Sequence, residues 1–360
     1  MKFTCMSVAG IVSVLLCVMA GLQGCAMPAA TTVAGSAGKT VSTIAGQAGV
    51  KGNTDGTGSG ATFSFPAGLV ILNGNLYICD SFNSTIRQLN LSTEAVTTIA
   101  GGAGEAGNFQ TPPAYFYSPE GITTDGTNLY VADSGNNMIR MLTPSGTSWT
   151  ISTLAGSPNG QAGSSDGVGT NASLNNPLGI CYDSANKTLY VADSGNSAIR
   201  AVPTNGTSTS TLVSQATEAL MWPEGIAYSG GNLYVVDSGN CAVLQVTVPG
   251  GAVTVIAGQV GVKGDVDGTG SAANFDWPEG ITSDAAGNLY VTDTLNSTIR
   301  QVAIGTGAVT TLAGQGGSTG SADGVGNVAT FNNPMRLVFD PSSSSLYVAD
   351  TYNETIRQVH

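Results

Sequence analysis

The sequence predicts an all-β protein that folds as a six-bladed β-propeller of four-stranded antiparallel blades. The first observation is a repeated phrase, Leu-Tyr-Val-Ala-Asp-Ser-Gly-Asn, which occurs at 129–136 and again at 189–196. Looser copies of the phrase begin at Leu76, Leu233, Leu289 and Leu346. The second observation is the composition, because 50 Gly and only 9% charged residues suit short strands and tight turns. Such a phrase repeated at long intervals indicates a repeat architecture.

Each repeat contains four β-type stretches joined by turns of hairpin length. A Pro starts the unit, and a short apolar stretch such as 121–123 follows it. The repeated phrase supplies the second stretch, a run such as 299–302 the third, and an alternating run such as 308–314 the fourth. The starting prolines are Pro66, Pro119, Pro177, Pro223, Pro278 and Pro334. Six such units predict radially stacked blades.

The two ends of the repeat region predict how the ring closes. The sixth unit has a third stretch, Thr355–Val359, but no fourth stretch after it. The missing stretch is at the other end, because Val41–Gly46 resembles the fourth stretch of the first unit, Val96–Gly101. We therefore expect Val41–Ala45 to pair with Thr355–Val359, which protects an edge that would otherwise invite aggregation.

The repeats resemble the NHL-repeat family of six-bladed propellers. The resemblance rests on the Pro-x-Gly-Ile start, the Gly-Asn-Leu-Tyr-Val-Ala-Asp core and the Asn-x-Ile-Arg end of the units, and it covers Val41 to His360. The segment between units, AGQAGVKGNTDGTGSGATF at 45–63, is most similar to the NHL repeats of teneurin-type and bacterial envelope proteins. The family implies the fold but serves many functions, so it specifies no single activity.

The N-terminal segment predicts export and a lipid anchor. Residues 1–24 contain an apolar run after Lys2 that is typical of a signal peptide, and Leu22-Gln23-Gly24-Cys25 resembles a bacterial lipobox. The expected organisation is a signal peptide at 1–24, a lipidated Cys25 with a flexible tether at 25–40, and the propeller at 41–360. The resemblance also implies outer-membrane sorting, through Ala26. The alternative is an ordinary signal peptide with a chance Cys.

An Asp ends the repeated phrase in every unit, and an Arg follows seven residues later in five units. We expect a buried Asp–Arg pair in each of these blades; the alternative is a ring of Asp that binds a metal or a substrate. In the fourth unit Asp237 faces Leu244 in place of Arg. The predicted structural pairs use Asp80 with Arg87, Asp133 with Arg140, Asp193 with Arg200, Asp293 with Arg300, and Asp350 with Arg357.

Four Asp-Gly loops keep a constant spacing to an apolar residue eight positions later. The Asp residues are Asp55, Asp166, Asp267 and Asp323, and the apolar residues are Phe63, Leu174, Phe275 and Phe331. This pattern predicts a Gly-rich turn followed by an apolar plug between blades. Asp265 and Asp267 suggest calcium as an alternative, but the acidic residue that would complete an EF-hand-like loop is absent.

The residues that flank the starting Pro differ between units, and differences of this kind are where function is expected. We expect them to rim one mouth of the central channel, where they would accept a cationic peptide segment or a sugar. The alternative is a set of solvated Glu with two Trp that plug blade junctions. The candidate rim consists of Glu120, Glu224, Glu279, Arg336, Trp222 and Trp277.

Several functional classes are disfavoured. The net charge of −12 and the scattered basic residues disfavour nucleic acid and an anionic membrane surface, so the lipid on Cys25 is the expected membrane contact. His360 is the sole histidine, which excludes a multi-histidine zinc site and a Ser–His–Asp triad, and departs from the NHL-type lyases. Cys79, Cys181 and Cys241 are an odd number with wide spacing and predict no disulfide framework.

These patterns together predict an exported lipoprotein, monomeric and without a cofactor, whose propeller binds a protein or a glycan partner. Two alternatives stay open. The first is a metal-dependent lactonase or similar hydrolase centred on the channel, which would hold a cation near Glu120, Glu224 or Glu279. The second is a structural spacer of the cell envelope.

Overall fold

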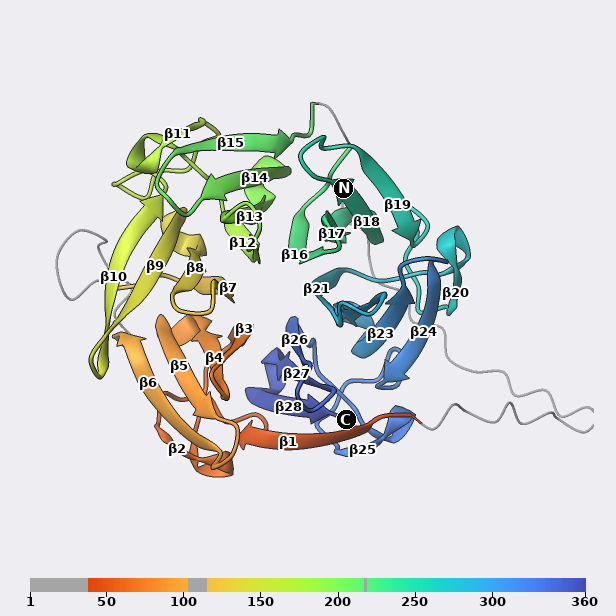
Figure 1. The fold of residues 1–360 in the computed structure, drawn as a ribbon. Helices are drawn as coiled ribbons and strands as arrows, with labels where there is room; N and C mark the ends of the chain where they lie inside the picture. Colours follow the sequence, from red (N-terminus) through yellow and green to blue (C-terminus); the bar gives the residue numbers. More distant parts are fainter. Residues whose placement is uncertain (1–37, 103–114, 217–218) are drawn as a thin grey trace, which may run out of the picture. The chain divides into compact units, whose positions relative to one another are not determined.

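Six antiparallel sheets stand around a central axis as the blades of a propeller (Figure 1). The structure is a computed structural model, and it describes residues 38–102, 115–216 and 219–360. The predicted signal peptide, Cys25 and most of the tether lie outside the described residues. No helix within the described ranges is long and apolar enough to cross a membrane. The prediction of a six-bladed all-β propeller is confirmed.

The first three blades follow one another along the chain, and each places its first strand nearest the axis (Figure 1). Blade 1 contains β2 (Gly56–Thr57), β3 (Pro66–Leu72), β4 (Asn75–Asp80), β5 (Thr85–Asn90) and β6 (Ala95–Gly101). Blade 2 contains β7 (Pro119–Thr124), β8 (Leu129–Asp133), β9 (Met138–Ser145) and β10 (Ser148–Ala155). Blade 3 contains β11 (Gly167–Val168), β12 (Pro177–Asp183), β13 (Thr188–Asp193), β14 (Ala198–Pro203) and β15 (Ser208–Val213).

The last three blades complete the ring. Blade 4 contains β16 (Pro223–Ser229), β17 (Asn232–Asp237), β18 (Ala242–Thr247) and β19 (Val253–Ala257). Blade 5 contains β20 (Gly268–Thr269), β21 (Pro278–Ser283), β22 (Asn288–Asp293), β23 (Thr298–Ala303) and β24 (Ala308–Ala313). Blade 6 contains β25 (Gly324–Val325), β26 (Arg336–Asp340), β27 (Ser345–Asp350), β28 (Thr355–Val359) and the N-terminal strand β1 (Thr40–Gly46).

Single turns of 3₁₀ helix occur at two places in the repeat. One set follows the second strand of each blade and comprises η2 (Ser81–Asn83), η3 (Ser134–Asn136), η5 (Ser194–Asn196), η6 (Ser238–Asn240), η8 (Thr294–Asn296) and η10 (Thr351–Asn353). The other set follows the Asp-Gly loops and comprises η1 (Gly58–Gly60), η4 (Gly169–Asn171), η7 (Gly270–Ala272) and η9 (Gly326–Val328). The first set therefore lies within the repeated phrase.

The ring closes through the N-terminal strand, as predicted. Strand β1 runs antiparallel to β28, with Val41 opposite Val359 and Gly46 opposite Thr355. Thr40 and His360 exchange backbone hydrogen bonds of 2.8 and 2.9 Å. Because Val41 and Ala45 are buried in this pairing, the closure also adds apolar contacts between the two ends of the repeat region.

Four blades carry a fifth strand that the sequence pattern did not predict. The two-residue strands β2, β11, β20 and β25 come from the Asp-Gly loops and pair with the outermost long strand of a blade. Each loop crosses that outer edge on its way to the next first strand. A pair of residues is too short to show the alternation that identifies a strand in a sequence.

Glycine allows the first strands to approach one another closely at the axis. A Cβ atom built on Gly121 would lie 2.1 Å from the carbonyl oxygen of Leu178 in the next blade. The Gly of the Pro-x-Gly phrase meets the following blade in the same way in four other places. These are Gly68, Gly179, Gly225 and Gly280. The phrase therefore contains Gly because the backbone of the next blade occupies the space of a side chain.

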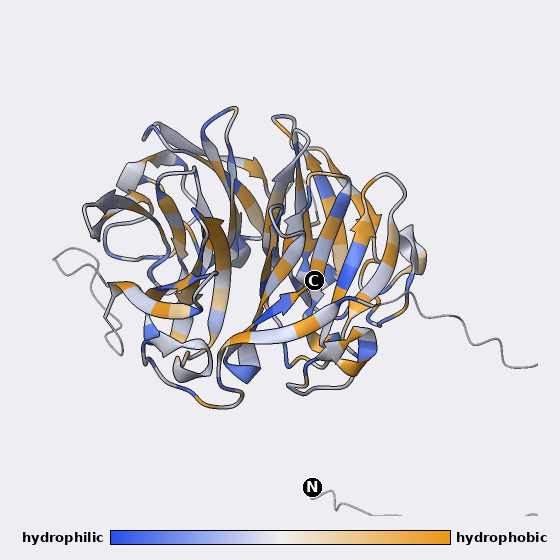
Figure 2. Cartoon of the chain, turned by 60° about the horizontal axis from the view of Figure 1, so that its bottom comes forward, coloured by the Kyte–Doolittle hydropathy of each residue, from blue (hydrophilic) through white to orange (hydrophobic). Residues whose placement is uncertain are grey.

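A ring of hydroxyl groups joins each blade to the next. The Ser or Thr after the phrase Asp donates to the carbonyl oxygen of the following blade's starting Pro. The distances are 2.5 Å from Ser81 to Pro119 and 2.8 Å from Thr351 to Pro66, the bond that joins blade 6 to blade 1. The intervening donors are Ser134, Ser194, Ser238 and Thr294. Figure 2 shows hydrophobic residues alternating with more polar ones along the strands, and the buried residues are largely apolar, so these hydroxyls are polar links within an apolar core.

Candidate functional site

The Asp that ends each second strand is the centre of a buried polar network. In blade 1, Asp80 Oδ1 accepts the backbone N–H of Ser64 at 2.7 Å. Its Oδ2 accepts from Asn83 Nδ2 at 2.8 Å and from Arg87 Nη1 at 2.6 Å. Burial raises the pKa of Asp80 to about 6, while Asn83, Ser64 and Arg87 lower it. The carboxylate is therefore ionised at neutral pH and pairs with the guanidinium.

The structure brings all five predicted Asp–Arg pairs together. The Nη1–Oδ2 distances are 2.6 Å for Arg87–Asp80, 3.0 Å for Arg140–Asp133, 2.8 Å for Arg200–Asp193, 2.5 Å for Arg300–Asp293 and 2.6 Å for Arg357–Asp350. Both side chains of every pair are buried. In blade 4, Leu244 is buried where the other blades have Arg, and burial raises the pKa of Asp237 to about 6. These residues are parts of the scaffold.

The Asp-Gly loops supply a second carboxylate to four of the same arginines, which the sequence analysis did not foresee. Arg300 Nη2 lies 2.8 Å from Asp267 Oδ1, and the N–H of Thr311 donates to Asp267 Oδ2 at 3.0 Å. Asp55, Asp166 and Asp323 repeat this arrangement in blades 1, 3 and 6. The calcium alternative gains no support, because the described part of the chain has no group of three His, Cys, Asp or Glu side chains arranged to hold a metal ion.

The predicted apolar plugs lie directly against these arginines. The guanidinium carbon of Arg87 is 5.2 Å from the ring centre of Phe63, and the same distance separates Arg300 from Phe275. Phe331 covers Arg357 in the same way, whereas blade 3 has Leu174 at this position. The constant spacing between loop and plug therefore positions both an ion partner and a cation–π partner for one arginine.

Four of the six candidate rim residues lie at the axis and are buried. Glu120, Glu224, Glu279 and Arg336 have only 8%, 6%, 7% and 6% of their surface exposed. We call these four residues the carboxyl cluster. The expectation of an open acidic rim is wrong, because the first strands pack closely at the axis and these carboxyl side chains are buried among them.

The carboxyl cluster holds more charge than its contacts neutralise. Arg336 Nη1 donates to the backbone oxygen of Glu279, while its Nε and Nη2 are buried without a hydrogen-bond partner. Oε2 of Glu120 and Oε2 of Glu279 also lack partners. Three carboxyls therefore share one guanidinium in a poorly hydrated place, which favours their protonated forms.

Burial is the main cause of the shifted pKa values in the cluster. It raises the pKa of Glu120 to about 7, against a lowering by Arg336, and Glu224 raises it further. It also raises the pKa of Glu224 to about 7, while Arg336 and a hydrogen bond to the Trp277 side chain lower it. The pKa of Glu279 is raised by burial and by Glu224. Glu120 and Glu224 therefore exchange protons near neutral pH.

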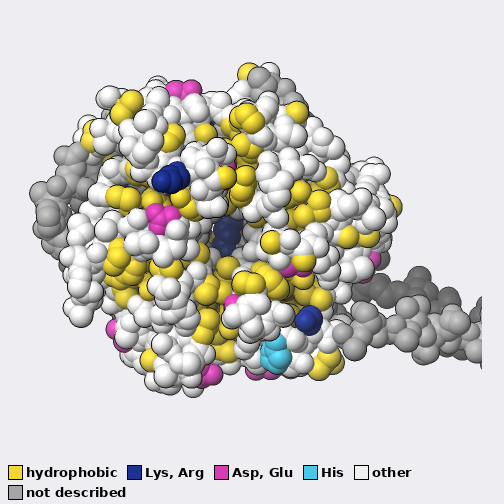
Figure 3. Space-filling model, viewed as in Figure 1, with side chains coloured by type: hydrophobic (Ala, Val, Ile, Leu, Met, Phe, Trp, Pro, Cys, Tyr) yellow, Lys and Arg dark blue, Asp and Glu magenta, His cyan; other side chains and the backbone are white. Residues whose placement is uncertain are grey.

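A hollow on the axis lies next to this cluster. Its deeper part has a volume of about 60 Å³ and is lined by glycines, by Ile and Leu side chains and by Arg336. Its wider part, of about 230 Å³, is lined by the later residues of the first strands, among them Tyr182, Tyr228, Thr282 and Ser283. Figure 3 shows the hollow at the centre of the ring, with hydrophobic groups around it and a Lys or Arg side chain at its bottom. Arg336 is the residue of that kind among its lining residues.

The opposite face of the propeller carries the turns that precede the first strands. The residue before the starting Pro has a φ between 48° and 58° in all six blades. These residues are Phe65, Ser118, Asn176, Trp222, Trp277 and Asn333. Since the backbone is the same in each blade, this left-handed turn belongs to the scaffold and its side chain is free to differ. Trp222 is 47% exposed and Trp277 is half-buried.

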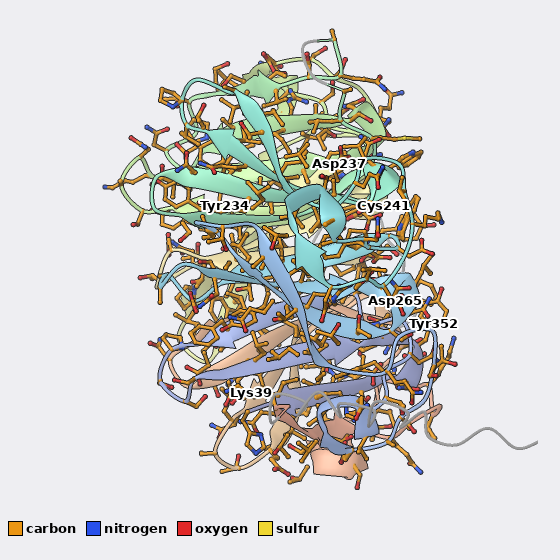
Figure 4. The ribbon with its side chains drawn as sticks, turned by 90° about the vertical axis from the view of Figure 1, so that its right-hand side faces the viewer. Lys39, Tyr234, Asp237, Cys241, Asp265 and Tyr352 are labelled. Carbon is orange, nitrogen blue, oxygen red and sulfur yellow. The ribbon has the colours of Figure 1, made fainter. Side chains whose placement is uncertain are left out.

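Other apolar side chains are exposed beside these turns. The middle residue of the adjoining 3₁₀ turn donates its N–H to the residue preceding the left-handed position, as Tyr352 does to Asn332 at 3.1 Å. Figure 4 places Tyr352 and Cys241 at one edge of the molecule and Tyr234, at the start of β17, toward the other. We call this surface the turn face. Its exposed large side chains are Phe82, Tyr117, Met221, Trp222, Leu295 and Tyr352.

The sequence analysis found Trp222 and Trp277 but missed the residues of the 3₁₀ turns. A usable signal was present, because one position varies inside an otherwise constant phrase. That position is occupied by Phe82, Gly135, Gly195, Gly239, Leu295 and Tyr352. Phe65 stacks on Phe82 with ring centres 4.3 Å apart, and Tyr352 meets Phe65 edge-on at 5.5 Å. Side chains from blades 1 and 6 therefore form one aromatic patch.

Comparison with known proteins agrees with the pattern of sequence repeats described above. A family model for the NHL repeat matches residues 174–201 and 220–245, which begin just before the starting Pro of the third and the fourth repeat. The chain is an NHL-repeat propeller. It is 29% identical over 330 residues to NHL repeat-containing protein 2 of Homo sapiens, and this match covers 85% of the chain and 40% of that protein. It is 30% identical over 323 residues to Protein SUPPRESSOR OF QUENCHING 1, chloroplastic, of Arabidopsis thaliana, covering 86% and 26% respectively. The NHL-repeat propeller thus spans less than half the length of either relative.

Solved structures share the fold at lower identity. An auxiliary nutrient binding protein from Bacteroides thetaiotaomicron matches with a TM-score of 0.70 and 21% identity, covering 90% of this chain and 77% of that one. A chain of a nidogen/laminin complex matches with a TM-score of 0.52 and 19% identity, covering 76% and 93%. At these identities the likeness supports the architecture of the NHL-repeat propeller alone.

The buried Asp–Arg network gives a stability prediction. Changing Arg300→Leu should lower the free energy of unfolding by about 3–5 kcal/mol, because buried Asp293 loses its charged partner. Blade 4 shows that a Leu fits this place, since Leu244 occupies it. Urea unfolding followed by circular dichroism measures the change. The double variant Arg300→Leu with Asp293→Asn is the control and should recover part of the loss; an unchanged single variant would contradict the network's role.

The carboxyl cluster gives a pH prediction. The pKa of Glu120 and Glu224 is raised from 4.5 to about 7, so the folded protein binds protons that the unfolded chain has released. This contribution to stability is present below the unfolded pKa and is lost as the pH rises through the folded pKa. From about pH 5 to about pH 8, wild-type stability should therefore fall relative to a variant with Glu120, Glu224 and Glu279→Gln. Parallel unfolding curves at each pH test this, and parallel pH dependences for both proteins would contradict it.

Proposed function

We propose that this NHL-repeat propeller is a binding module whose turn face docks a protein partner. The observation that carries the proposal is the exposure of Phe82, Tyr117, Trp222, Leu295 and Tyr352 on one face. Trp and Tyr are the side chains most often found at the energetic centres of protein interfaces. The turn face therefore has the composition of an interface core.

The positions of these side chains support a role other than folding. The scaffold needs the left-handed backbone and the hydrogen bond between the two turns, and blades 2, 3 and 4 meet the latter need with Gly in the 3₁₀ turn. Phe82, Leu295 and Tyr352 occupy the same position in the other three blades and remain exposed. Large apolar side chains that the fold does not require are best explained by contact with another molecule.

A protein partner fits this face better than a glycan. Met221 and Leu295 add flexible apolar surface beside the aromatic rings, and Met is enriched in protein interfaces. Lys51 lies 5.9 Å above the ring of Phe82 and 3.7 Å from the carboxylate of Glu354, which places one charged pair at the border of the aromatic patch. Related folds support a binding role, since solved neighbours include an auxiliary nutrient binding protein and a member of a nidogen/laminin complex.

A crosslinking and affinity experiment tests the proposal. A photo-crosslinking amino acid at Tyr352 should capture one dominant protein from envelope extract, and the same group at Val325 on the outer edge should not. Replacing Tyr117, Trp222 and Tyr352 with Ala should then weaken binding of the purified partner by about tenfold or more.

The matched control replaces exposed Val168, Val325 and Val328, which lie in or beside the short outer strands, with Ala. Equal loss with both sets would contradict a specific turn face. A glycan captured in place of a protein would redirect the proposal to carbohydrate. No loss with either set would favour the spacer alternative.

We also propose that the protein is exported and lipid-anchored in the outer membrane through Cys25. Support comes from the apolar run at 1–24 and the lipobox-like Leu22-Gln23-Gly24-Cys25. Changing Cys25→Ser should abolish incorporation of labelled palmitate and move the protein from the membrane to the soluble fraction. Cys79→Ser is the control, because that thiol is buried in blade 1. Palmitate labelling that survives Cys25→Ser would contradict the anchor.

A further inference from the structure

The hollow on the axis combines an apolar wall with one charged side chain. The third residue after the starting Pro of every blade lines both its deeper and its wider part. These residues are Leu69, Ile122, Ile180, Ile226, Ile281 and Leu337. Because the two parts share this ring, they form one continuous space that is open on the face seen in Figure 3. The turn face is at the other end of the first strands.

Arg336 is an exception to the repeat. Five first strands have a Gly at this position, where the next blade's backbone leaves no room for a side chain. In blade 6 the Pro does not pair with the second strand, and β26 begins at Arg336 itself, opposite Ala349. The Arg336 side chain lines the deeper hollow. No feature of the scaffold requires the guanidinium there, because the other blades are complete without one.

Only one of the three guanidinium nitrogens of Arg336 has a hydrogen-bond partner. Nη1 donates to the backbone oxygen of Glu279, but Nε and Nη2 have no partner and the residue is 94% buried. The N–H bonds of Nε and Nη2 lie on the same edge of the planar guanidinium, and this edge matches the two oxygens of a carboxylate. A buried N–H without an acceptor costs free energy, so a ligand that supplies acceptors is stabilised there.

We propose that the hollow binds a small monocarboxylate with an aliphatic tail. The carboxylate receives the free edge of Arg336, and the tail lies along the ring of Leu and Ile side chains. A wall of apolar side chains with one convergent polar group is the usual composition of a small-molecule site. The deeper part, at about 60 Å³, holds a head group, and the wider part leaves room for the tail.

The groups facing Arg336 make this binding depend on pH. They are Glu120 from β7, Glu224 from β16, Glu279 from β21 and the thiol of Cys79 from β4. Burial raises the pKa of Cys79, so its thiol stays neutral. Below pH 7 Glu120 and Glu224 are largely protonated, and burial raises the pKa of Glu279 as well, so the guanidinium charge is left for the ligand. Above pH 7 Glu120 and Glu224 ionise, and their negative charges oppose the binding of an anion in this low-dielectric place.

A metal ion or an organic cation fits the hollow less well. The residues that line it offer one positive charge and no carboxylate. The described residues also include no group of three acidic, His or Cys side chains suited to a metal. The three glutamates are not among the residues that line the hollow, so a ligand within it contacts the guanidinium and no carboxylate.

The test uses butanoate as the probe and the chain from residue 26 to 360. Saturation-transfer NMR and calorimetry at about pH 6 should show saturable binding of butanoate, with at least about tenfold weaker binding of butanol and of butylamine. Raising the pH to about 8 should weaken butanoate binding several-fold. Calcium chloride is included as a probe for a metal site.

Arg336→Gly is the matched variant, because it restores the residue that the five other blades carry and should therefore fold. It should lose butanoate binding by at least about tenfold, and Arg336→Lys, which keeps the charge without the two-pronged edge, should show an intermediate loss. Trp222→Ala on the turn face is the control and should bind butanoate as the wild type does. Thermal melts of each variant confirm that folding is retained.

Each possible outcome of these measurements either supports or overturns the proposed site. Binding that requires Arg336, prefers the carboxylate and weakens at high pH supports the site. Absence of saturable binding, equal binding by Arg336→Gly, or equal binding of butanol overturns it. Calcium binding that depends on the glutamates would also overturn it in favour of a metal site. These results are independent of the turn face, whose variants leave the hollow unchanged.

Discussion

The buried carboxylate at the end of each second strand is the interaction on which the rest of the propeller depends. Asp133, for example, accepts hydrogen bonds from the backbone of Tyr117, from Asn136 and from Arg140. A carboxylate in an apolar core is tolerated only when such partners are present, so the four positions are constrained together. The same network joins the entry turn, the second strand and the third strand in the five blades that carry the Arg. Its neighbour in sequence, Ser134, links the blade to the next one.

This constraint also explains where the chain is free to vary. The network requires the backbone N–H of the entry turn and the left-handed residue after it, but it does not use their side chains. Trp222 and Tyr117 therefore occupy places that Asn176 and Asn175 occupy in another blade, without a change in backbone. The scaffold thus presents six equivalent turns on one face and allows each to carry a different side chain. A binding surface built in this way needs no irregularity in the fold.

The axis of the propeller follows a second constraint, the close approach of neighbouring first strands. At five junctions a Gly lies directly against a backbone carbonyl of the next blade. Glu120, Glu224 and Glu279 are buried at these closely packed first strands, although the same residues at an open mouth would be solvated. Arg336 breaks the glycine pattern, and the local pairing of blade 6 changes with it. The replacement of one repeated Gly by Arg336 therefore places a guanidinium in the hollow on the axis.

The sequence by itself determined the number of blades, the four long strands of each, the closure by Val41–Ala45 and the partners of the buried Asp. These features follow from repeated local patterns. Because every blade has the same fold, comparison of the repeats shows which positions need the same residue in each blade. It also identified the positions near the starting Pro as those that differ. The two-residue outer strands, the second carboxylate on each loop and the burial of the carboxyl cluster depended on the tertiary structure alone. They arise where segments far apart in the chain meet. A local sequence pattern gives neither the distances between such segments nor the dielectric around their side chains.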